Sequence, residues 1–253
     1  MNEPRILTQD LGDGVTVVTL NRPAKMNALD QSMVDAMHQV LGELEKSQTL
    51  RAVVLTGAGQ KAFVAGADIA QLKARTAADA LRGINAKLFQ RIENFCVPVI
   101  AAVRGYALGG GCELALSCDL RVGGPSTRFG QPEADLGIIP AAGATWRLPR
   151  IVGLGKAKEL VLLGERVRGE EAYRIGLLNR LVPDEEVLDT AIAMAQRIAA
   201  RGPTAIRLAK IALNTANAID ATTGVAFESV AQATCFESAD KHARMQAFLD
   251  RKK

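Results

Sequence analysis

Two glutamates and two glycine-containing turns carry the chemistry that this chain of 253 residues offers. Three consecutive glycines at residues 109–111 follow a short apolar run and lead into a helix-forming segment that contains Cys112 and Glu113. Because the first N–H groups of a helix have no partner within it, such a start can hold a negatively charged oxygen. The stretch fits an oxyanion site beside an acid or base, and it fits equally well a tight packing turn with a surface glutamate.

A second turn of this kind, Ala65-Gly66-Ala67-Asp68, lies between an expected strand and a helix-like segment. If the two turns end neighbouring strands, their N–H groups face the same way and can hold one oxygen between them. Two unrelated helix starts are the alternative that the residues leave open.

The second carboxylate, Glu133, follows Gln131 and Pro132 in an expected turn. The proline restricts the backbone there, and the Gln131 side chain could orient the carboxylate. Paired carboxylates in a dry cleft work as acid and base because their environments separate their pKa values. A glutamate taken singly is most often a surface residue, so the glycines before Glu113 and the proline before Glu133 are what favour a chemical role.

Other kinds of chemistry find little support in the sequence. The two histidines, His38 and His242, lie inside expected helices and in no metal-ligand spacing, so no metal site is expected. No Gly-x-Ser-x-Gly motif occurs, and Cys112 has no histidine placed to activate it. Residues 153–156 contain half of a nucleotide-binding loop and fit a helix start better.

Composition and charge describe an ordinary globular chain, with 48% hydrophobic and 23% charged residues. The longest apolar run, residues 97–103, is too short to span a bilayer, and the first residues lack the apolar core of a secretory signal. Four cysteines without a Cys-x-x-Cys pair are expected to be reduced thiols. We therefore expect a cytoplasmic protein without membrane attachment. A net charge of +4 with 4% aromatic residues permits an anionic small molecule but does not favour nucleic acid.

The elements that must position the glutamates form two parts, which together predict an α/β fold. Strands and helices alternate over residues 1–150: a hairpin of 5–10 and 15–20, a helix from about 30 to 47, a strand at 52–56, a helix over 77–94, a strand over 97–103, and short strands at 120–122 and 127–129. This alternation predicts parallel pairing. Helices are expected over 156–163, 170–175, 185–201, 204–216, 227–235 and 240–252, with one short strand at 179–182. The predicted division is a core of residues 1–190 and a helical region of residues 191–253.

In order and at the expected separations, four motifs of this chain resemble those of the enoyl-CoA hydratase/isomerase, or crotonase, family. They are Asn21-Arg22-Pro23 with Asn27-Ala28-Leu29, residues 62–68, residues 105–115, and residues 129–133 continuing to Gly137 and Pro140. The resemblance covers essentially the whole chain. It implies a spiral of β-β-α units with a C-terminal helical trimerisation region, and hence a homotrimer or a hexamer of two trimers.

The resemblance also implies an acyl-CoA thioester as ligand, with its thioester oxygen held by the N–H groups of Ala67 and Gly110. Hydratases of the family resemble this chain in having both Glu113 and Glu133. The implied reaction is reversible addition of water to the 2,3 double bond of a trans-2-enoyl-CoA. Glu113 would act as the base while oxygen adds at C3, and Glu133 would deliver the proton to C2. No cofactor is implied, because CoA is part of the substrate.

Contacts with the substrate are also implied residue by residue. Those expected for CoA and its arm are Arg22, Lys25, Ala65, Ala67, Asp68, Ile69, Ala70, Gly110 and, from a neighbouring subunit, Phe248 and Arg251. Residues 141–146 depart from the glycine-rich run that is common in the family, so Pro140 and Trp146 are expected to shape the acyl pocket. Ala70 stands where relatives often have lysine, which removes one possible phosphate contact.

Two alternatives stay open on the sequence alone. Trp146 and the altered run after Pro140 would suit another enzyme of the family, such as an enoyl-CoA double-bond isomerase or a hydratase of a specialised acyl-CoA. The mildly basic charge would suit a CoA- or RNA-binding protein with vestigial catalysis, and the intact pair of acids weighs against it.

Overall fold

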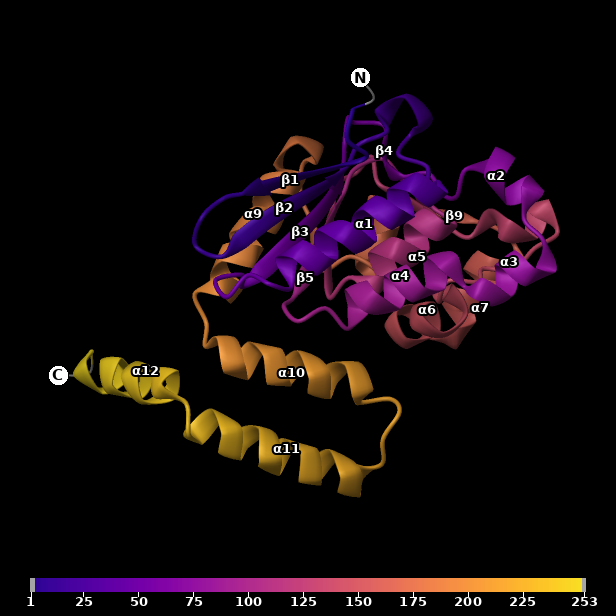
Figure 1. The fold of residues 1–253 in the computed structure, drawn as a ribbon. Helices are drawn as coiled ribbons and strands as arrows, with labels where there is room; N and C mark the ends of the chain where they lie inside the picture. Colours follow the sequence, from indigo (N-terminus) through magenta and orange to yellow (C-terminus); the bar gives the residue numbers. More distant parts are fainter. Residues whose placement is uncertain (1–2, 252–253) are drawn as a thin grey trace.

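Short apolar strands alternate along the chain with helices and build two sheets, as seen in the computed structural model, which describes residues 3–251 (Figure 1). The larger sheet contains, in spatial order, β1 (Ile6–Asp10), β2 (Val15–Leu20), β3 (Ala52–Gly57), β5 (Val99–Val103), β7 (Leu120–Gly123) and β10 (Arg180–Leu181). From β2 onward all its neighbours are parallel, as the strand–helix–strand order predicts. β1 and β2 form the expected antiparallel hairpin.

The smaller sheet has the order β4 (Ala62–Val64), β6 (Tyr106–Leu108), β8 (Arg128–Gly130) and β9 (Arg166–Arg168). Each of β3, β5 and β7 lies in the larger sheet, and the strand that follows it in the chain lies in the smaller one. Helices come after each of these strand pairs, so the chain advances by repeated β-β-α units. This arrangement confirms the α/β spiral that the family resemblance implies.

Helices cover the sheets and continue beyond them. They are α1 (Gln31–Leu44), α2 (Ile69–Ala74), α3 (Ala77–Arg82), α4 (Ile84–Glu93), α5 (Gly110–Ser117), α6 (Ala144–Val152), α7 (Leu154–Leu162), α8 (Gly169–Arg174), α9 (Val187–Ala199), α10 (Pro203–Thr215), α11 (Ala221–Phe236) and α12 (Ala239–Asp250). Short 3-10 helices occur at η1 (Pro23–Lys25), η2 (Pro132–Leu136) and η3 (Asp184–Glu186). No helix within the described residues is long and apolar enough to cross a membrane.

The inner strands of the larger sheet, β2, β3, β5 and β7, are buried on both faces, which explains their nearly continuous apolar sequences. In β3, Val53 and Leu55 belong to the core that includes α1, α4 and α5, whereas Ala52 and Val54 pack with α9. The alternation follows the two-residue period of a strand. Figure 1 accordingly shows α1 and α9 on opposite faces of this sheet.

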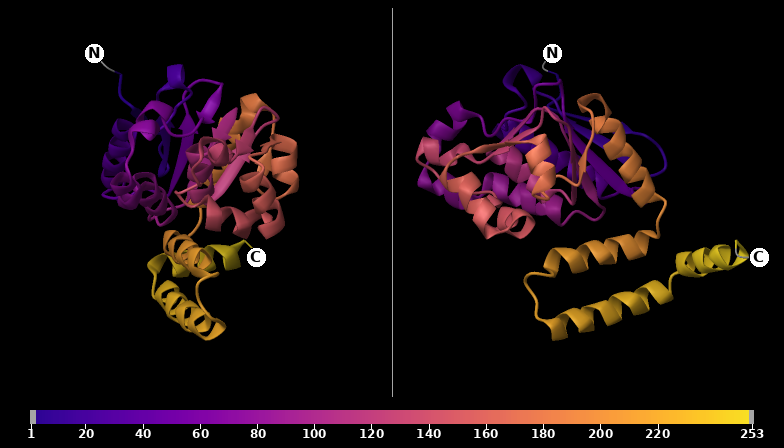
Figure 2. Two further views of the ribbon diagram at one scale, coloured as in Figure 1. Left: turned by 90° about the vertical axis from the view of Figure 1, so that its right-hand side faces the viewer. Right: turned by 180° about the vertical axis from the view of Figure 1, so that it is seen from behind.

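The boundary predicted after residue 190 lies inside α9, and the structure places the change of architecture later. Val187, Ala191 and Ala195 of α9 are buried against the larger sheet, so the whole helix belongs to the core. Helices α10, α11 and α12 extend away from the core as an arm (Figures 1 and 2). Two side chains of α10 attach the arm. Lys210 pairs with Asp119 at 2.8 Å, and Asn214 Nδ2 donates to the carbonyl of Glu93 at 2.8 Å.

Several further elements differ from the sequence predictions. The single helix expected over 77–94 is divided into α3 and α4, because Gly83 adopts a left-handed conformation with φ of +59°. Helix α11 begins at Ala221 instead of 227, with Asp220 as its N-cap. Strands β4, β6 and β9, each of three residues, were not expected.

Candidate active site

The glycine run forms the start of α5 and brings its first amide beside the Ala65–Asp68 turn. A Cβ placed on Gly110 would lie only 3.8 Å from the backbone nitrogen of Ala67. Ala67 itself forms an isolated β-bridge with Leu29. The hydrogen bonds of this bridge are donated by the amides of Leu29 and Asp68, and not by the amide of Ala67. Gly110 is the first residue of α5, where an N–H has no partner in the helix. The two amides are therefore neighbours that can serve a bound oxygen.

Close packing explains why the residues around Gly110 are also glycines. A Cβ on Gly111 would collide with the carbonyl oxygen of Val64 in β4. Gly109 has φ of +50°, and a Cβ there would lie 2.9 Å from Oε1 of Glu133. Side chains at these two positions would push α5 away from β4 and displace the Glu133 carboxylate.

Glu113 is buried in the first turn of α5, and backbone amides hold its carboxylate. Oε1 accepts hydrogen bonds from the nitrogens of Ala142 at 2.7 Å and Ala144 at 3.1 Å. Burial raises the pKa of Glu113, while these two N–H groups and the nearby Arg147 charge act in the opposite direction. The side chain is thus fixed in a dry place by donors that favour its ionised form.

Glu133 reaches the same place from η2, where Pro132 begins the 3-10 helix. With its amide oriented so that nitrogen faces the carboxylate, Gln131 donates to both oxygens of Glu133 at 3.0 and 3.1 Å. Burial first, and the Glu113 carboxylate second, raise the pKa of Glu133 to about 7. Glu133 can therefore gain and lose a proton near neutral pH.

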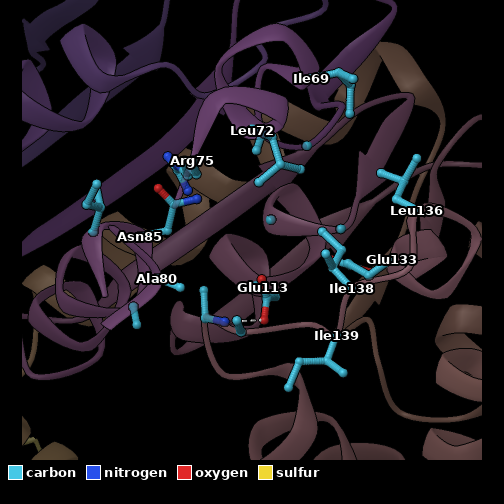
Figure 3. Close-up of a pocket in the computed structure, with 18 of the residues that line it drawn as sticks. Ile69, Leu72, Arg75, Ala80, Asn85, Glu113, Glu133, Leu136, Ile138 and Ile139 are labelled. Carbon is cyan, nitrogen blue, oxygen red and sulfur yellow. Dashed lines mark hydrogen bonds between the residues drawn. The ribbon is translucent and has the colours of Figure 1, made fainter. Parts of the chain in front are cut away.

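Both glutamates line a largely apolar cavity of about 570 Å³. One wall comes from α2, α3 and α4, and the other from η2 and the segment after it. In Figure 3 the glutamates face this space among the apolar side chains Ile69, Leu72, Leu136, Ile138 and Ile139. The cavity joins an acid–base pair, two main-chain donors and room for an apolar group.

Comparison with known proteins agrees with this site. Residues 10–253 match the family model described as enoyl-CoA hydratase/isomerase. The chain belongs to this family.

Relatives in the family are similar over nearly their full length. A short-chain-enoyl-CoA hydratase of Clostridium acetobutylicum is 46% identical over 94% of this chain and 92% of its own. A crotonyl-CoA hydratase of Syntrophomonas wolfei is 41% identical over 94% of this chain and 93% of its own. Among solved structures, an enoyl-CoA hydratase from Bacillus anthracis has a TM-score of 0.94 at 36% identity and covers 98% of this chain and 96% of its own.

The structure brings six of the fourteen site residues expected from the family resemblance to the cavity. Those that line it are Ala65, Ala67, Ile69, Gly110, Glu113 and Glu133. Asp68 and Ala70 do not line it, although Ile69 between them does. The Asp68 side chain is the N-cap of α2 and accepts from the Ala70 amide.

The two basic residues expected to meet CoA have different surroundings. Arg22 Nη1 lies 2.8 Å from Asp68 and 3.4 Å from Asp30 and donates to the carbonyl of Ala28. Its charge is thus used to hold the loop before α1 against α2. Lys25 is exposed at the end of η1 and makes no ion pair within residues 3–251.

Pro140 and Trp146, expected to shape the acyl pocket, do not line the cavity. Trp146 lies on α6, and its ring is stacked against Arg147 and Arg150, with guanidinium carbons 4.0 and 5.0 Å from the ring centroid. Ala141 and Ala142 line the cavity on this side instead.

The remaining expected contacts lie on the arm. Phe248 belongs to α12 and Arg251 is the C-cap of this helix, and neither lines the cavity of its own chain. Figure 1 shows α12 at the end of the arm, away from α2, α3 and α4. Their predicted contact with a neighbouring subunit's CoA stays a prediction.

Sequence reasoning missed the wall formed by α3 and α4, including Asn85 of α4, and also Arg75 at the C-cap of α2. Asn85 Nδ2 lies 3.8 Å from the position of a Cβ on Gly110, and its Oδ1 is buried without a hydrogen-bond partner. No local motif distinguishes these residues, since they belong to helices whose orientation is determined by packing.

Two other chemistries can be compared with the structure. Burial, together with the neighbouring Glu113 charge, raises the pKa of Cys112 far above its usual range, which makes a poor nucleophile. Among residues 3–251, no three His, Cys, Asp or Glu side chains cluster as a metal site would require.

Proposed function

We propose that this protein is an enoyl-CoA hydratase, which adds water reversibly and with syn geometry to the 2,3 double bond of a trans-2-enoyl-CoA to give a 3-hydroxyacyl-CoA. The observation that carries the proposal is the pair of buried glutamates, Glu113 and Glu133, facing one cavity beside two convergent amides. The names of the most similar relatives support the same reaction.

In this proposal the amides of Ala67 and Gly110 hold the thioester oxygen. Addition of water at C3 moves negative charge onto this oxygen, and the hydrogen bonds strengthen as the charge develops. Each such donor is typically worth about 3–4 kcal/mol in the transition state. Because the donors are main-chain groups on packed elements, they need no rearrangement during the reaction.

The two carboxylates divide the proton transfers according to their surroundings. Glu113 receives two backbone N–H bonds that favour its ionised form, so we assign it the role of base toward the attacking water. Glu133, whose pKa is about 7, is well suited to carry a proton and deliver it to C2. In dehydration the roles reverse.

In this proposal the acyl group lies between the two walls of the cavity, and the CoA portion of the substrate extends outward along residues 65–69. The exposed Lys25 could meet a phosphate of CoA, whereas Arg22 acts through its ion pair with Asp68. The proposed attack of water at C3 and the protonation of C2 require no cofactor, since the chain supplies the acid, the base and the oxyanion donors.

We also propose that the arm assembles subunits into trimers, or hexamers of two trimers. Apolar side chains are exposed along it: Ile211, Leu213, Val225, Val230, Phe236, Met245, Phe248 and Leu249. The free thiols of Cys96, Cys112, Cys118 and Cys235 support a reducing compartment such as the cytoplasm.

A hydration assay tests the proposal. The protein is mixed with crotonyl-CoA and then with longer trans-2-enoyl-CoAs, and the loss of the conjugated thioester absorbance is followed. We expect turnover by the parent and at least a hundredfold lower kcat in Glu113→Gln and in Glu133→Gln, on the order of an acid–base contribution. Absence of turnover on every enoyl-CoA would refute the function, and full activity of either variant would refute the assigned roles.

A further inference from the structure

A buried ion pair lies behind the segment that holds Glu113. The Arg147 side chain is only 4% exposed, and its guanidinium donates to both oxygens of Glu93, at 3.1 and 2.8 Å. Its Nη1 donates to the carbonyl of Ala142 at 2.9 Å. Bidentate pairing fixes a guanidinium in both position and plane, so this arginine is a rigid support.

The supported segment is the one whose amides bind Glu113. Ala142 accepts from Arg147 with its carbonyl and donates to Glu113 with its amide. Gly143 follows with φ of +123°, and a Cβ there would collide with the Arg147 guanidinium. The segment is thus wrapped closely around the arginine, and its shape depends on where the guanidinium lies.

We infer that Arg147, held by Glu93, is a positioning residue that fixes the carboxylate of Glu113 through the segment 142–144. It does not line the cavity, so it acts on the catalytic group and not on the substrate. This inference rests on the proposed hydratase function for its kinetic consequences only. The Glu113 carboxylate is held in the same way whatever the substrate.

The surroundings of Glu113 indicate a second, electrostatic consequence. The charged or titratable groups around it are Glu133 from η2, Cys112 from α5, Arg147 from α6 and, beyond the arginine, Glu93 from α4. The Arg147 charge opposes the effect of burial on the pKa of Glu113. Loss of this charge, or of the amides that it holds in place, raises that pKa further.

The first test compares Arg147→Met with Arg147→Lys, using Arg150→Met as a matched control. Arg150 also lies on α6 beside Trp146, but it is exposed. For Arg147→Met we expect a kcat lower by about 10- to 100-fold, as small displacements of catalytic groups produce. We expect KM within about threefold of the parent, because Arg147 itself does not line the cavity and Ala142 is the one residue of segment 142–144 that does. The acid limb of the kcat–pH profile should move to higher pH.

The other two variants separate the charge from the geometry. Arg147→Lys keeps the charge but cannot bridge Glu93 and Ala142 with a planar fork. We expect its acid limb to stay near that of the parent while its kcat remains lowered. Arg150→Met should match the parent in both. A folded Arg147→Met with the kcat and pH profile of the parent, or with a change in KM alone, would overturn the inference.

Two further measurements keep the inference testable under other outcomes. If Arg147→Met does not fold, Glu93→Gln tests the inference instead. We expect this variant to have a severalfold lower kcat, with no upward move of the acid limb of its kcat–pH profile. A kcat equal to that of the parent would overturn the inference. If the parent hydrates no enoyl-CoA, the proposed function fails. The pKa of Glu113 can then still be followed by the infrared band of its protonated carboxyl, assigned by its loss in Glu113→Gln. No upward shift of this pKa in Arg147→Met would refute the role of the arginine.

Discussion

Replacing Glu133 by glutamine should make the folded protein more stable in mildly alkaline solution, although it removes one of the two proposed catalytic acids. Burial, together with the Glu113 carboxylate, raises the pKa of Glu133 from 4.5 to about 7. The folded chain therefore holds this proton more tightly than the unfolded chain. Glutamine has nearly the same shape, can still accept a hydrogen bond from Gln131, and never ionises.

The size and sign of the effect follow from this difference. Below about pH 4.5 Glu133 is protonated in both states, and its ionisation contributes nothing to stability. As the pH rises toward 7, the unfolded chain releases the proton first, so the parent loses stability. Above pH 7 the folded state carries the full cost, which at about 1.4 kcal/mol for each pH unit between the two pKa values comes to about 3 kcal/mol. The glutamine variant should gain up to this amount over the parent.

Urea unfolding at a series of pH values from about 5 to about 8 measures the gain as a difference in the free energy of unfolding. Glu170→Gln, which changes an exposed glutamate on α8, is the control and should show no growing advantage. If the difference between Glu133→Gln and the parent is the same at both ends of the pH range, the raised pKa and its physical cause are wrong.

Other predictions follow from the packing. Gly111→Ala should lower both the melting temperature and kcat, because the new Cβ collides with a β4 carbonyl, whereas Gly155→Ala, with open space around it, should melt at or above the parent temperature. Lys210→Met should lower the free energy of unfolding by about 3–5 kcal/mol in urea titrations, because it leaves the mostly buried Asp119 without its charged partner and with only the Val99 amide as a donor. The double change with Asp119→Asn should recover part of the loss. Dialysis against EDTA should leave crotonyl-CoA hydration unchanged, and a loss restored by added metal would contradict the cofactor-free mechanism.

Local patterns predicted the functional groups of the site better than their surroundings. The start of α5 and the turn before Glu133 depend on a few neighbouring residues, and glycine and proline mark such turns in the sequence. The direction of Trp146 could not be predicted in this way. Its position on α6 turns the ring toward two arginines and away from the cavity, and only the packing of the whole helix determines that direction.

The support of Glu113 lay beyond sequence reasoning for a related reason. Arg147 and Glu93 are 54 residues apart, and neither has a local motif that marks it as one half of a pair. The division of the helix expected over 77–94 similarly depends on packing, since a glycine within a helical pattern is compatible with either a continuous or a broken helix. Contacts between distant elements are what the linear pattern does not contain.

The amides of Ala67 and Gly110, which we propose bind the thioester oxygen, belong to the main chain, and this has a consequence for inheritance. Apart from proline, no substitution at a position removes its N–H group, so a descendant of this gene keeps both N–H groups while its side chains change. Substitutions at positions 113 and 133 would change the acid–base groups without removing these two donors. A lineage can thus exchange one reaction of acyl thioesters for another without rebuilding the site, and a family described by the two words hydratase and isomerase fits such a history.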